Sequence, residues 1–283
     1  MNTMTRIIAP LGLVAMTALS ASAGTFTEPI GLQLYSLRDE FKISVSGGIK
    51  KVKAFGFKDV ELAGTYDLPP PAFSKMLEDA GLNPVAGHFP FDRFRDDPEG
   101  VSRDARALGL GYAGCAWIPH EGAFDENEAR KAVAVFNKAG EILKKDGIQF
   151  YYHIHGYEFH KHRNGTLLDL IISETDAELV AFELDVLWAV FPGQDPVELL
   201  EKHGSRWQLM HVKDLRKGVE TGSLSGKTDV TNDVPVGTGQ VNWPAVLEAA
   251  KKAGVKHYFI EDESPTVLEQ IPRSLEYLKK VTW

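Results

Sequence analysis

Short apolar runs alternate with longer segments in which apolar residues recur every three or four positions, from residue 30 to the end of the chain. The short runs have the composition of buried strands, and each longer segment offers one apolar stripe, as a helix packed on a sheet does. The pattern predicts eight strands, at residues 30–35, 59–62, 84–88, 112–117, 148–154, 179–185, 208–212 and 257–261. Since strands that alternate with helices form parallel sheets, we predict an α/β fold.

Eight strand–helix units in about 250 residues match the size of a single closed (β/α)₈ barrel, the TIM barrel. Glycines between a helical segment and the next strand support this division, because a left-handed residue commonly ends a helix. These glycines are Gly56, Gly81, Gly109, Gly147 and Gly254. An open, doubly wound sheet is the alternative, but no Gly-x-Gly-x-x-Gly motif follows the first strand, as a dinucleotide-binding fold would usually require.

Residues 1–23 have the pattern of an export signal. A start that carries Arg6 leads into the apolar run 7–19, and residues 21–23 are small, as a signal peptidase requires. We expect a cleaved signal peptide at 1–23, a catalytic barrel domain at 24–283, and a periplasmic or secreted protein. A membrane anchor is the alternative, but the run is shorter than the roughly 18 to 20 apolar residues of a span. No stable membrane span is therefore expected after cleavage.

Composition narrows the possible partners and cofactors. The chain has 283 residues, 43% of them apolar and 25% charged, which is typical of a globular protein. Its 31 basic and 39 acidic residues give a net charge of −8, and the basic residues form no stripe, so nucleic acid is not an expected partner. Cys115 is the single cysteine, which excludes an intrachain disulfide and a cysteine-based zinc site. A metal ion would have to bind through His, Asp and Glu.

Ionisable residues gather where the last four predicted strands end: His153, His155, Glu158, Glu183, Asp185, His211, Lys213 and Glu261. The C-terminal ends of barrel strands open onto one mouth, so these side chains are predicted to meet there. Buried carboxylates repel one another, and each costs several kcal/mol to desolvate unless a positive group compensates. We therefore expect one divalent metal ion, and the residue types fit Mn²⁺, Zn²⁺, Mg²⁺ or Co²⁺ without choosing among them.

Residues next to these positions have simpler predicted roles. Asp214 and Asp262 each follow an inward-facing residue, so they should point away from the barrel axis and cap the following helix. Glu183 should lie one layer deeper in the barrel and pair with a lysine or histidine. His88, at the end of the third strand, is either a substrate contact or structural. The polar segment 215–240 is too long for a tight connection and is predicted to be an active-site loop.

Five motifs in the chain resemble the xylose isomerase-like TIM-barrel superfamily, the group of sugar phosphate isomerases and epimerases. The motifs are residues 31–38 (GLQLYSLR), 152–159 (YHIHGYEF), 184–188 (LDVLW), 211–214 (HVKD) and 260–261 (IE). The resemblance covers nearly all of residues 24–283 and implies a metal ion held by Glu158, Asp185, His211 and Glu261. Many members have a glutamate where this chain has His153. Either Glu158 reaches back from the following loop or His153 is the ligand, and we predict Glu158.

The resemblance also implies proton removal next to a carbonyl group, through an enediolate, with a small carbohydrate as the partner. Glu158 and Glu261 would act as acid and base, with His153 and His155 as alternatives. Lys213 would stabilise a developing oxyanion. The residues predicted to contact substrate are Tyr35, His88, Trp117 and Trp188.

Isomerisation or epimerisation is the expected outcome, and a 3-keto-glycoside lyase or hydratase that uses the same enolisation is the alternative. An export signal favours an unphosphorylated sugar, because sugar phosphates are mainly intracellular. An endonuclease IV-like enzyme would need more histidines, including one at the position of Trp188. A non-catalytic periplasmic sugar-binding protein is the remaining alternative. The sequence does not indicate an oligomeric state.

Overall fold

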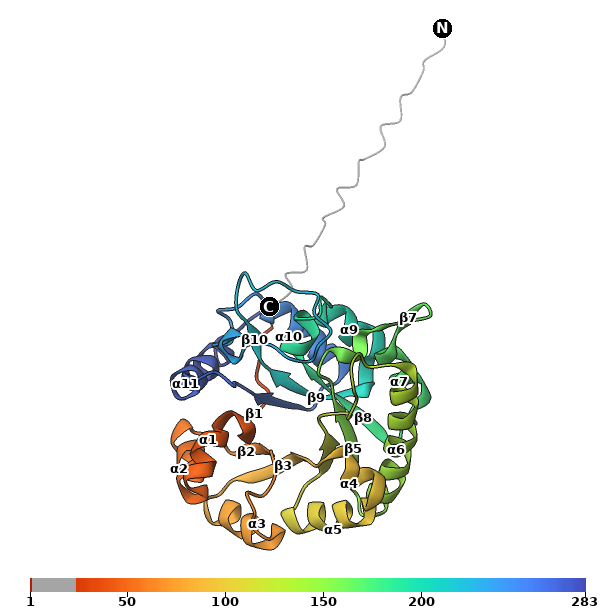
Figure 1. Ribbon diagram of the computed structural model, residues 1–283. Helices are drawn as coiled ribbons and strands as arrows, with labels where there is room; N and C mark the ends of the chain where they lie inside the picture. The colour runs from red at the N-terminus through yellow and green to blue at the C-terminus, as the bar shows by residue number, and fades with distance from the viewer. Residues whose placement is uncertain (2–23) are drawn as a thin grey trace.

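Eight parallel strands close into a barrel in the computed structural model, which describes Met1 and residues 24–283 (Figure 1). The strands are β1 (Ile30–Gln33), β2 (Asp59–Leu62), β3 (Asn83–His88), β4 (Tyr112–Cys115), β5 (Gln149–His153), β8 (Val180–Asp185), β9 (Trp207–Val212) and β12 (His257–Ile260). The predicted single (β/α)₈ barrel is confirmed. The open-sheet alternative is wrong, because β1 pairs with both β2 and β12. The predicted export signal lies outside the described residues.

Helices surround the barrel (Figure 1). They are α1 (Arg38–Ile43), α2 (Val45–Phe55), α3 (Pro70–Asp79), α4 (Phe91–Asp96), α5 (Pro98–Leu108), α6 (Glu126–Lys145), α7 (Leu167–Glu174), α8 (Val186–Val190), α9 (Pro196–His203), α10 (Trp243–Ala253) and α11 (Val267–Leu278). Four short 3₁₀ turns are η1 (Leu34–Leu37), η2 (Tyr157–Phe159), η3 (Gly204–Arg206) and η4 (Val230–Asn232). Gly56 and Gly254, at φ 91° and 90°, end α2 and α10 in the left-handed conformation predicted for them.

The lower part of the barrel interior is apolar. Its packed side chains are Ala86, Tyr151, Ala181, Leu209 and Phe259. The rings of Tyr151 and Phe259 fill the space that a Cβ would occupy at two glycines on other strands, Gly114 and Gly31. In each strand the residue two positions after this apolar residue is polar and points to the same side. A polar layer therefore lies directly above the five apolar side chains, which we call the apolar floor. The packing of this floor fixes the position of the charged side chains along the barrel axis.

The segment 215–240 is partly ordered by its own hydrogen bonds. β10 (Asp214–Leu215) pairs antiparallel with β11 (Asp233–Val234). The Asp214 carboxylate accepts hydrogen bonds from the backbone N–H groups of Gly237 (2.9 Å) and Gly239 (3.0 Å) and from Nε1 of Trp243 (3.0 Å). Asp214 therefore anchors the following segment and does not cap a helix, contrary to the sequence prediction; Asn242 stands at the N-cap of α10. The segment lies beside the barrel mouth.

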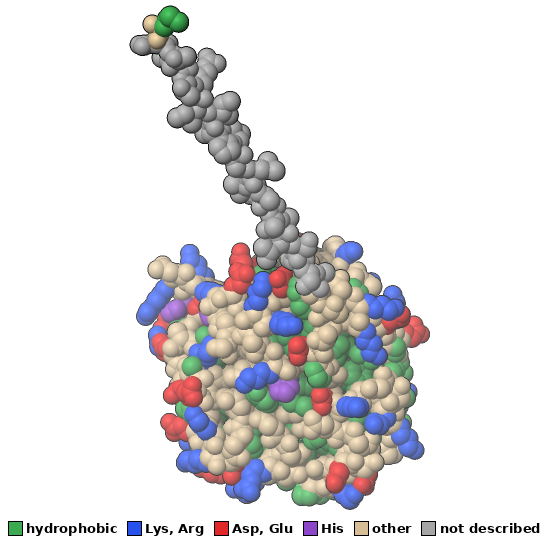
Figure 2. All heavy atoms as spheres, turned by 180° about the vertical axis from the view of Figure 1, so that it is seen from behind, with side chains coloured by type: hydrophobic (Ala, Val, Ile, Leu, Met, Phe, Trp, Pro, Cys, Tyr) green, Lys and Arg blue, Asp and Glu red, His purple; other side chains and the backbone are tan. Residues whose placement is uncertain are grey.

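On the face opposite to the view of Figure 1, no surface region is dominated by one sign of charge. Lys and Arg side chains are interspersed with Asp and Glu side chains over that face (Figure 2). Of the helices in the described part of the chain, none is long and apolar enough to cross a membrane. A second small sheet, β6 (Lys161–His162) with β7 (Gly165–Thr166), projects on the outside of the barrel (Figure 1).

Candidate metal centre and active site

Four buried side chains converge at the C-terminal ends of three strands and just after a fourth. They are His153 of β5, Asp185 of β8, His211 of β9 and Glu261, which follows β12, and we call them the metal group. One potential ligand atom from each lies within 4.8 Å of the others. His153 Nε2 and His211 Nδ1 are each 3.4 Å from Asp185 Oδ2. His211 Nδ1 is 3.2 Å from Glu261 Oε2.

These separations fit a bound divalent ion. Two ligand atoms that are each about 2.0–2.2 Å from one tetrahedral ion lie about 3.3 Å apart. His211 Nδ1 also has no hydrogen-bond partner among the described residues, although it is buried between two carboxylates. A metal ion would satisfy this nitrogen. Two imidazoles and two carboxylates form a mixed nitrogen and oxygen ligand set, which suits Zn²⁺, Mn²⁺ or Co²⁺.

The charges of the metal group in the absence of an ion depend on its neighbours. Burial alone lowers the pKa of a histidine, but Glu183, Glu61 and Glu261 raise the pKa of His211 well above its usual value. Burial and the charge of His211 lower the pKa of His153 to about 4. Burial raises the pKa of Asp185, but the hydrogen bond from His153 and the nearby His211 ring outweigh burial and hold that pKa below its usual value. His153 is therefore neutral at pH 7 and ready to act as a ligand, whereas His211 carries a proton that an ion would displace.

Glu158 does not lie in the metal group, contrary to the prediction that it supplies the ligand from the fifth strand. It follows Gly156, whose φ of 90° turns the chain away from the direction of β5. Its buried carboxylate accepts hydrogen bonds from the Tyr152 hydroxyl and, at 3.0 Å, from the backbone N–H of His155. Burial raises the pKa of Glu158 to about 7. His153, the alternative ligand, lies in the metal group instead.

Lys213 and His155 lie beside the metal group without belonging to it. Lys213 Nζ is 3.2 Å from Glu261 Oε2 and 2.6 Å from Glu263 Oε1. These carboxylates and Asp233 outweigh burial and keep the pKa of Lys213 well above its usual value, so its ammonium group stays charged. The His155 ring lies 4.5 Å from the His153 ring, and burial lowers the pKa of His155 well below its usual value. Beside the metal group, the site thus offers a fixed cation, Lys213, and a further neutral imidazole, His155.

Aromatic side chains line the space next to His155. The rings of Trp117 and Trp188 each lie 5.5 Å from its ring. Tyr35, in η1 directly after β1, is 44% exposed and carries the Arg38 guanidinium 4.6 Å above its ring. Three of the four residues predicted to contact substrate therefore lie at the C-terminal end of the barrel, where a sugar ring could stack on them.

His88, the fourth residue, lies below the metal group. Its Nε2 is 3.1 Å from Glu61 Oε1 and 3.4 Å from Glu183 Oε2. Burial lowers its pKa, but the two carboxylates outweigh that effect and raise it to about 9. We call Glu61, His88, Glu183 and His211 the inner polar layer; His211 belongs to both groups.

Glu61 is the principal residue that sequence reasoning missed. It is fully buried in β2, between Val60 and Leu62. Because successive side chains of a strand point to opposite faces, two apolar neighbours that face the helices imply that Glu61 faces the barrel axis. That signal was present in the sequence. Glu183, by contrast, lies near two histidines, as expected.

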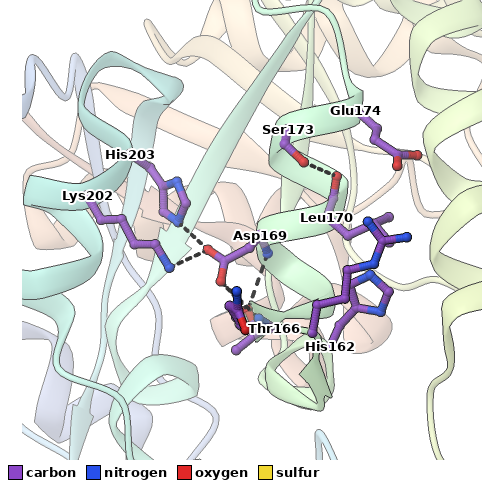
Figure 3. Close-up of a pocket in the computed structure, with 11 residues that line it drawn as sticks. His162, Thr166, Asp169, Leu170, Ser173, Glu174, Lys202 and His203 are labelled. Atoms are coloured by element: carbon purple, nitrogen blue, oxygen red, sulfur yellow. Dashed lines mark hydrogen bonds and ion pairs between the residues drawn. The ribbon is translucent and has the colours of Figure 1, made fainter.

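A surface hollow of about 470 Å³ lies away from this site, between α7 and α9 (Figure 3). Its central carboxylate, that of Asp169, is 2.6 Å from Lys202 Nζ and 3.0 Å from His203 Nε2. The same carboxylate accepts the backbone N–H of Thr166 at 2.9 Å and so caps α7. These polar groups lie within ion-pair distance of one another, and the arrangement is explained by the packing of two helices.

Comparisons with known proteins agree with this architecture. The sequence profile of the xylose isomerase-like TIM barrel family matches residues 49–281. A crystal structure of a sugar phosphate isomerase/epimerase from Parabacteroides distasonis is similar to the chain, with a TM-score of 0.72 and 28% identity. The match covers 95% of this chain and 99% of that one. The zinc-bound structure of the protein IolI is similar in fold, with a TM-score of 0.68 and 13% identity, and the match covers 89% of this chain and 95% of that one.

The chain also resembles a group of dehydratases. It is 25% identical over 167 residues to an inosose dehydratase from Geobacillus thermodenitrificans. The aligned residues cover 54% of this chain and 53% of the relative. Similar proteins of the same description from Clostridium perfringens are 26% identical over 176 residues, 56% of each chain. The chain thus spans about half the length of these relatives.

Proposed function

Because the chain belongs to the xylose isomerase-like TIM barrel family, we propose that it is a divalent-metal-dependent enzyme that removes a proton next to a carbonyl group of a carbohydrate. The observation that carries the proposal is the metal group, four buried ligand atoms within 4.8 Å of one another. The similar IolI structure contains a zinc atom, which supports a metal ion in a barrel of this fold.

The metal group would hold the ion, with His153 and His211 contributing nitrogens and Asp185 and Glu261 contributing oxygens. An ion bound there would act as a Lewis acid on a carbonyl oxygen and lower the cost of removing a proton from the adjacent carbon. The apolar floor below the site and the burial of all four ligand side chains keep the local dielectric constant low. A low dielectric constant strengthens the attraction between a bound ion and a negative oxygen.

Proton transfer is assigned to residues that lie beside the ion site. His155 is neutral and half-buried, and its Nδ1 has no hydrogen-bond partner among the described residues. Its ring faces the aromatic space, so it can accept the proton. Glu261, held by Lys213 at 3.2 Å, is the second candidate base. Lys213 donates a hydrogen bond to the oxygen that becomes negative. Glu158 acts indirectly, because it fixes the backbone of His155.

Two outcomes of the same proton removal remain in competition. The similar sugar phosphate isomerase/epimerase structure supports isomerisation or epimerisation, in which the proton returns to carbon. The similar inosose dehydratases support elimination, in which a group on the next carbon leaves. A 3-keto-glycoside lyase would follow the second course, and a hydratase would catalyse the reverse step, in which water adds to the double bond.

We further propose a substrate without a phosphate group, in the periplasm or outside the cell. Residues 1–23 have the pattern of an export signal. The cations at the mouth already have partners: Lys213 is paired with Glu261 and Glu263, and the Arg38 guanidinium donates to the carbonyl oxygens of Tyr35 and Glu263. A neutral sugar that stacks on Trp117 and Trp188 suits such a site better than a dianion.

The test is to incubate the metal-loaded protein in deuterated water with free sugars, 3-keto-glucosides and sugar phosphates, and to follow label and released groups by NMR. Label without bond cleavage supports an isomerase or epimerase, and release supports a lyase. Glu261→Gln should abolish both. The control Glu276→Gln, on an exposed turn of α11, should leave both unchanged. Ligand binding without label or release would contradict the proposal and favour a sugar-binding protein.

A further inference from the structure

His211 presents its two ring nitrogens to two different sets of carboxylates. Nδ1 faces the metal group, 3.4 Å from Asp185 and 3.2 Å from Glu261. Nε2 faces the inner polar layer, where it forms a 2.6 Å hydrogen bond with Glu61 Oε2. A neutral imidazole carries one proton, so the nitrogen that donates to Glu61 decides which nitrogen is free to bind an ion.

We propose that Glu61 is a positioning residue that keeps the proton of His211 on Nε2 and thereby leaves Nδ1 free to bind the divalent ion. The inference rests on the metal site of the proposed function and goes beyond it by assigning a role to a residue outside the ligand set. Hydrogen-bonded carboxylates behind metal-bound histidines orient the ring and increase its basicity, and their loss typically costs 10- to 100-fold in metal affinity.

Besides His211, two side chains from other strands hold Glu61 in place. Its Oε1 accepts a hydrogen bond from the Tyr151 hydroxyl of β5 and lies 3.1 Å from His88 Nε2 of β3. The other His88 nitrogen, Nδ1, lies 3.5 Å from the Gln33 side-chain amide of β1. The carboxylate is also fully buried, so water cannot replace these contacts. A chain of polar contacts from β1 through β3 and β2 to β9 therefore fixes the oxygen that faces His211.

A second ion in the inner polar layer is the competing interpretation, because these four residues also have ligand atoms within 4.8 Å of one another. The distance from His211 Nε2 to Glu61 Oε2 argues against it. At 2.6 Å this pair is closer than the roughly 3.3 Å expected between two ligand atoms of one tetrahedral ion. It lies much nearer to the roughly 2.7–2.9 Å of a charge-assisted N–H···O hydrogen bond. The geometry thus favours a proton between the two atoms.

The experiment compares the unmodified chain with Glu61→Gln and with the control Tyr151→Phe. Tyr151→Phe removes another hydrogen bond of Glu61 but keeps the carboxylate, and it controls for damage to the barrel interior. Zinc affinity is measured by competition with a chelator, and ¹⁵N-histidine NMR of the zinc-loaded protein identifies the nitrogen that binds the ion. Thermal unfolding verifies that each variant is folded.

We expect one zinc ion per chain, bound through Nδ1 of His211 with Nε2 protonated. Glu61→Gln should weaken zinc binding by about 10- to 100-fold, and Tyr151→Phe should weaken it far less. Equal affinity in Glu61→Gln and the unmodified chain, coordination through Nε2, or two ions per chain would each overturn the role of Glu61. Absence of zinc binding in the unmodified chain would instead remove the proposed metal-dependent function itself.

Discussion

In the proposed metal site, His153 takes the place of the carboxylate predicted as the ligand from the fifth strand, and this exchange changes the charge of the site. With Glu158 turned toward Tyr152, the metal group has two carboxylates and two imidazoles, so a divalent ion neutralises it. The low pKa of His153, about 4, keeps its nitrogen available near neutral pH. Burial of a ligand histidine thus favours metal binding over protonation.

His153→Ala should weaken binding of the divalent ion by more than about 100-fold, since loss of an indirect contact alone costs about 10- to 100-fold. Glu158→Gln is the matched test of the alternative ligand and should bind one ion with nearly unchanged affinity. Isothermal titration of metal-stripped protein measures both values. Retained affinity in His153→Ala together with lost affinity in Glu158→Gln would show that Glu158 is the ligand.

Metal affinity should rise with pH, because the ion displaces a proton from His211. The pKa of His211 lies well above its usual value in the metal-free site, so the proton is present throughout the neutral range. Below that pKa, each increase of one pH unit should strengthen binding by about tenfold. Calorimetry in buffers of different ionisation enthalpy should detect about one proton released per ion. Binding that does not depend on pH would show that His211 is not a ligand.

The strands and loops determine which of these residues could be found from the sequence. Asp185, His211 and Glu261 lie at or just beyond strand ends, so the alternation of apolar and polar positions was enough to predict that they converge. The position of Glu158 depends on the turn at Gly156, and a hydrogen bond to Tyr152 completes it. Such a turn is not encoded in strand periodicity, and for this reason the choice between His153 and Glu158 needed the structure.

Asp214 should be the main anchor of the segment 215–240. Asp214→Asn replaces a carboxylate oxygen with a group that cannot accept hydrogen bonds, which should destabilise the fold by about 1–3 kcal/mol. Trypsin should then cleave faster after Arg216, Lys217 or Lys227. The exposed N-cap Asp229 provides a control, because Asp229→Asn keeps an acceptor for the Thr231 N–H and should change stability by less than about 0.5 kcal/mol. Equal denaturation midpoints and cleavage rates in the two variants would contradict this anchoring role.

The whole barrel is built in layers from an apolar floor to a charged mouth. Tyr151 and Phe259 fill the space left by Gly114 and Gly31, and the inner polar layer and then the metal group lie above them. Closure of the sheet was predictable from the number and regular spacing of the strands. The depth of the polar groups was only partly predictable, since Glu61 comes from β2, in the half of the barrel where no ionisable cluster was expected.

Anomalous diffraction from a crystal loaded with zinc tests the central claim most directly. The account predicts one strong peak per chain, about 2.0–2.2 Å from ligand atoms of His153, Asp185, His211 and Glu261. The His211 ligand atom should be Nδ1, with Nε2 still hydrogen-bonded to Glu61. A peak coordinated by Glu158, or no peak between these four side chains at saturating zinc, would contradict it.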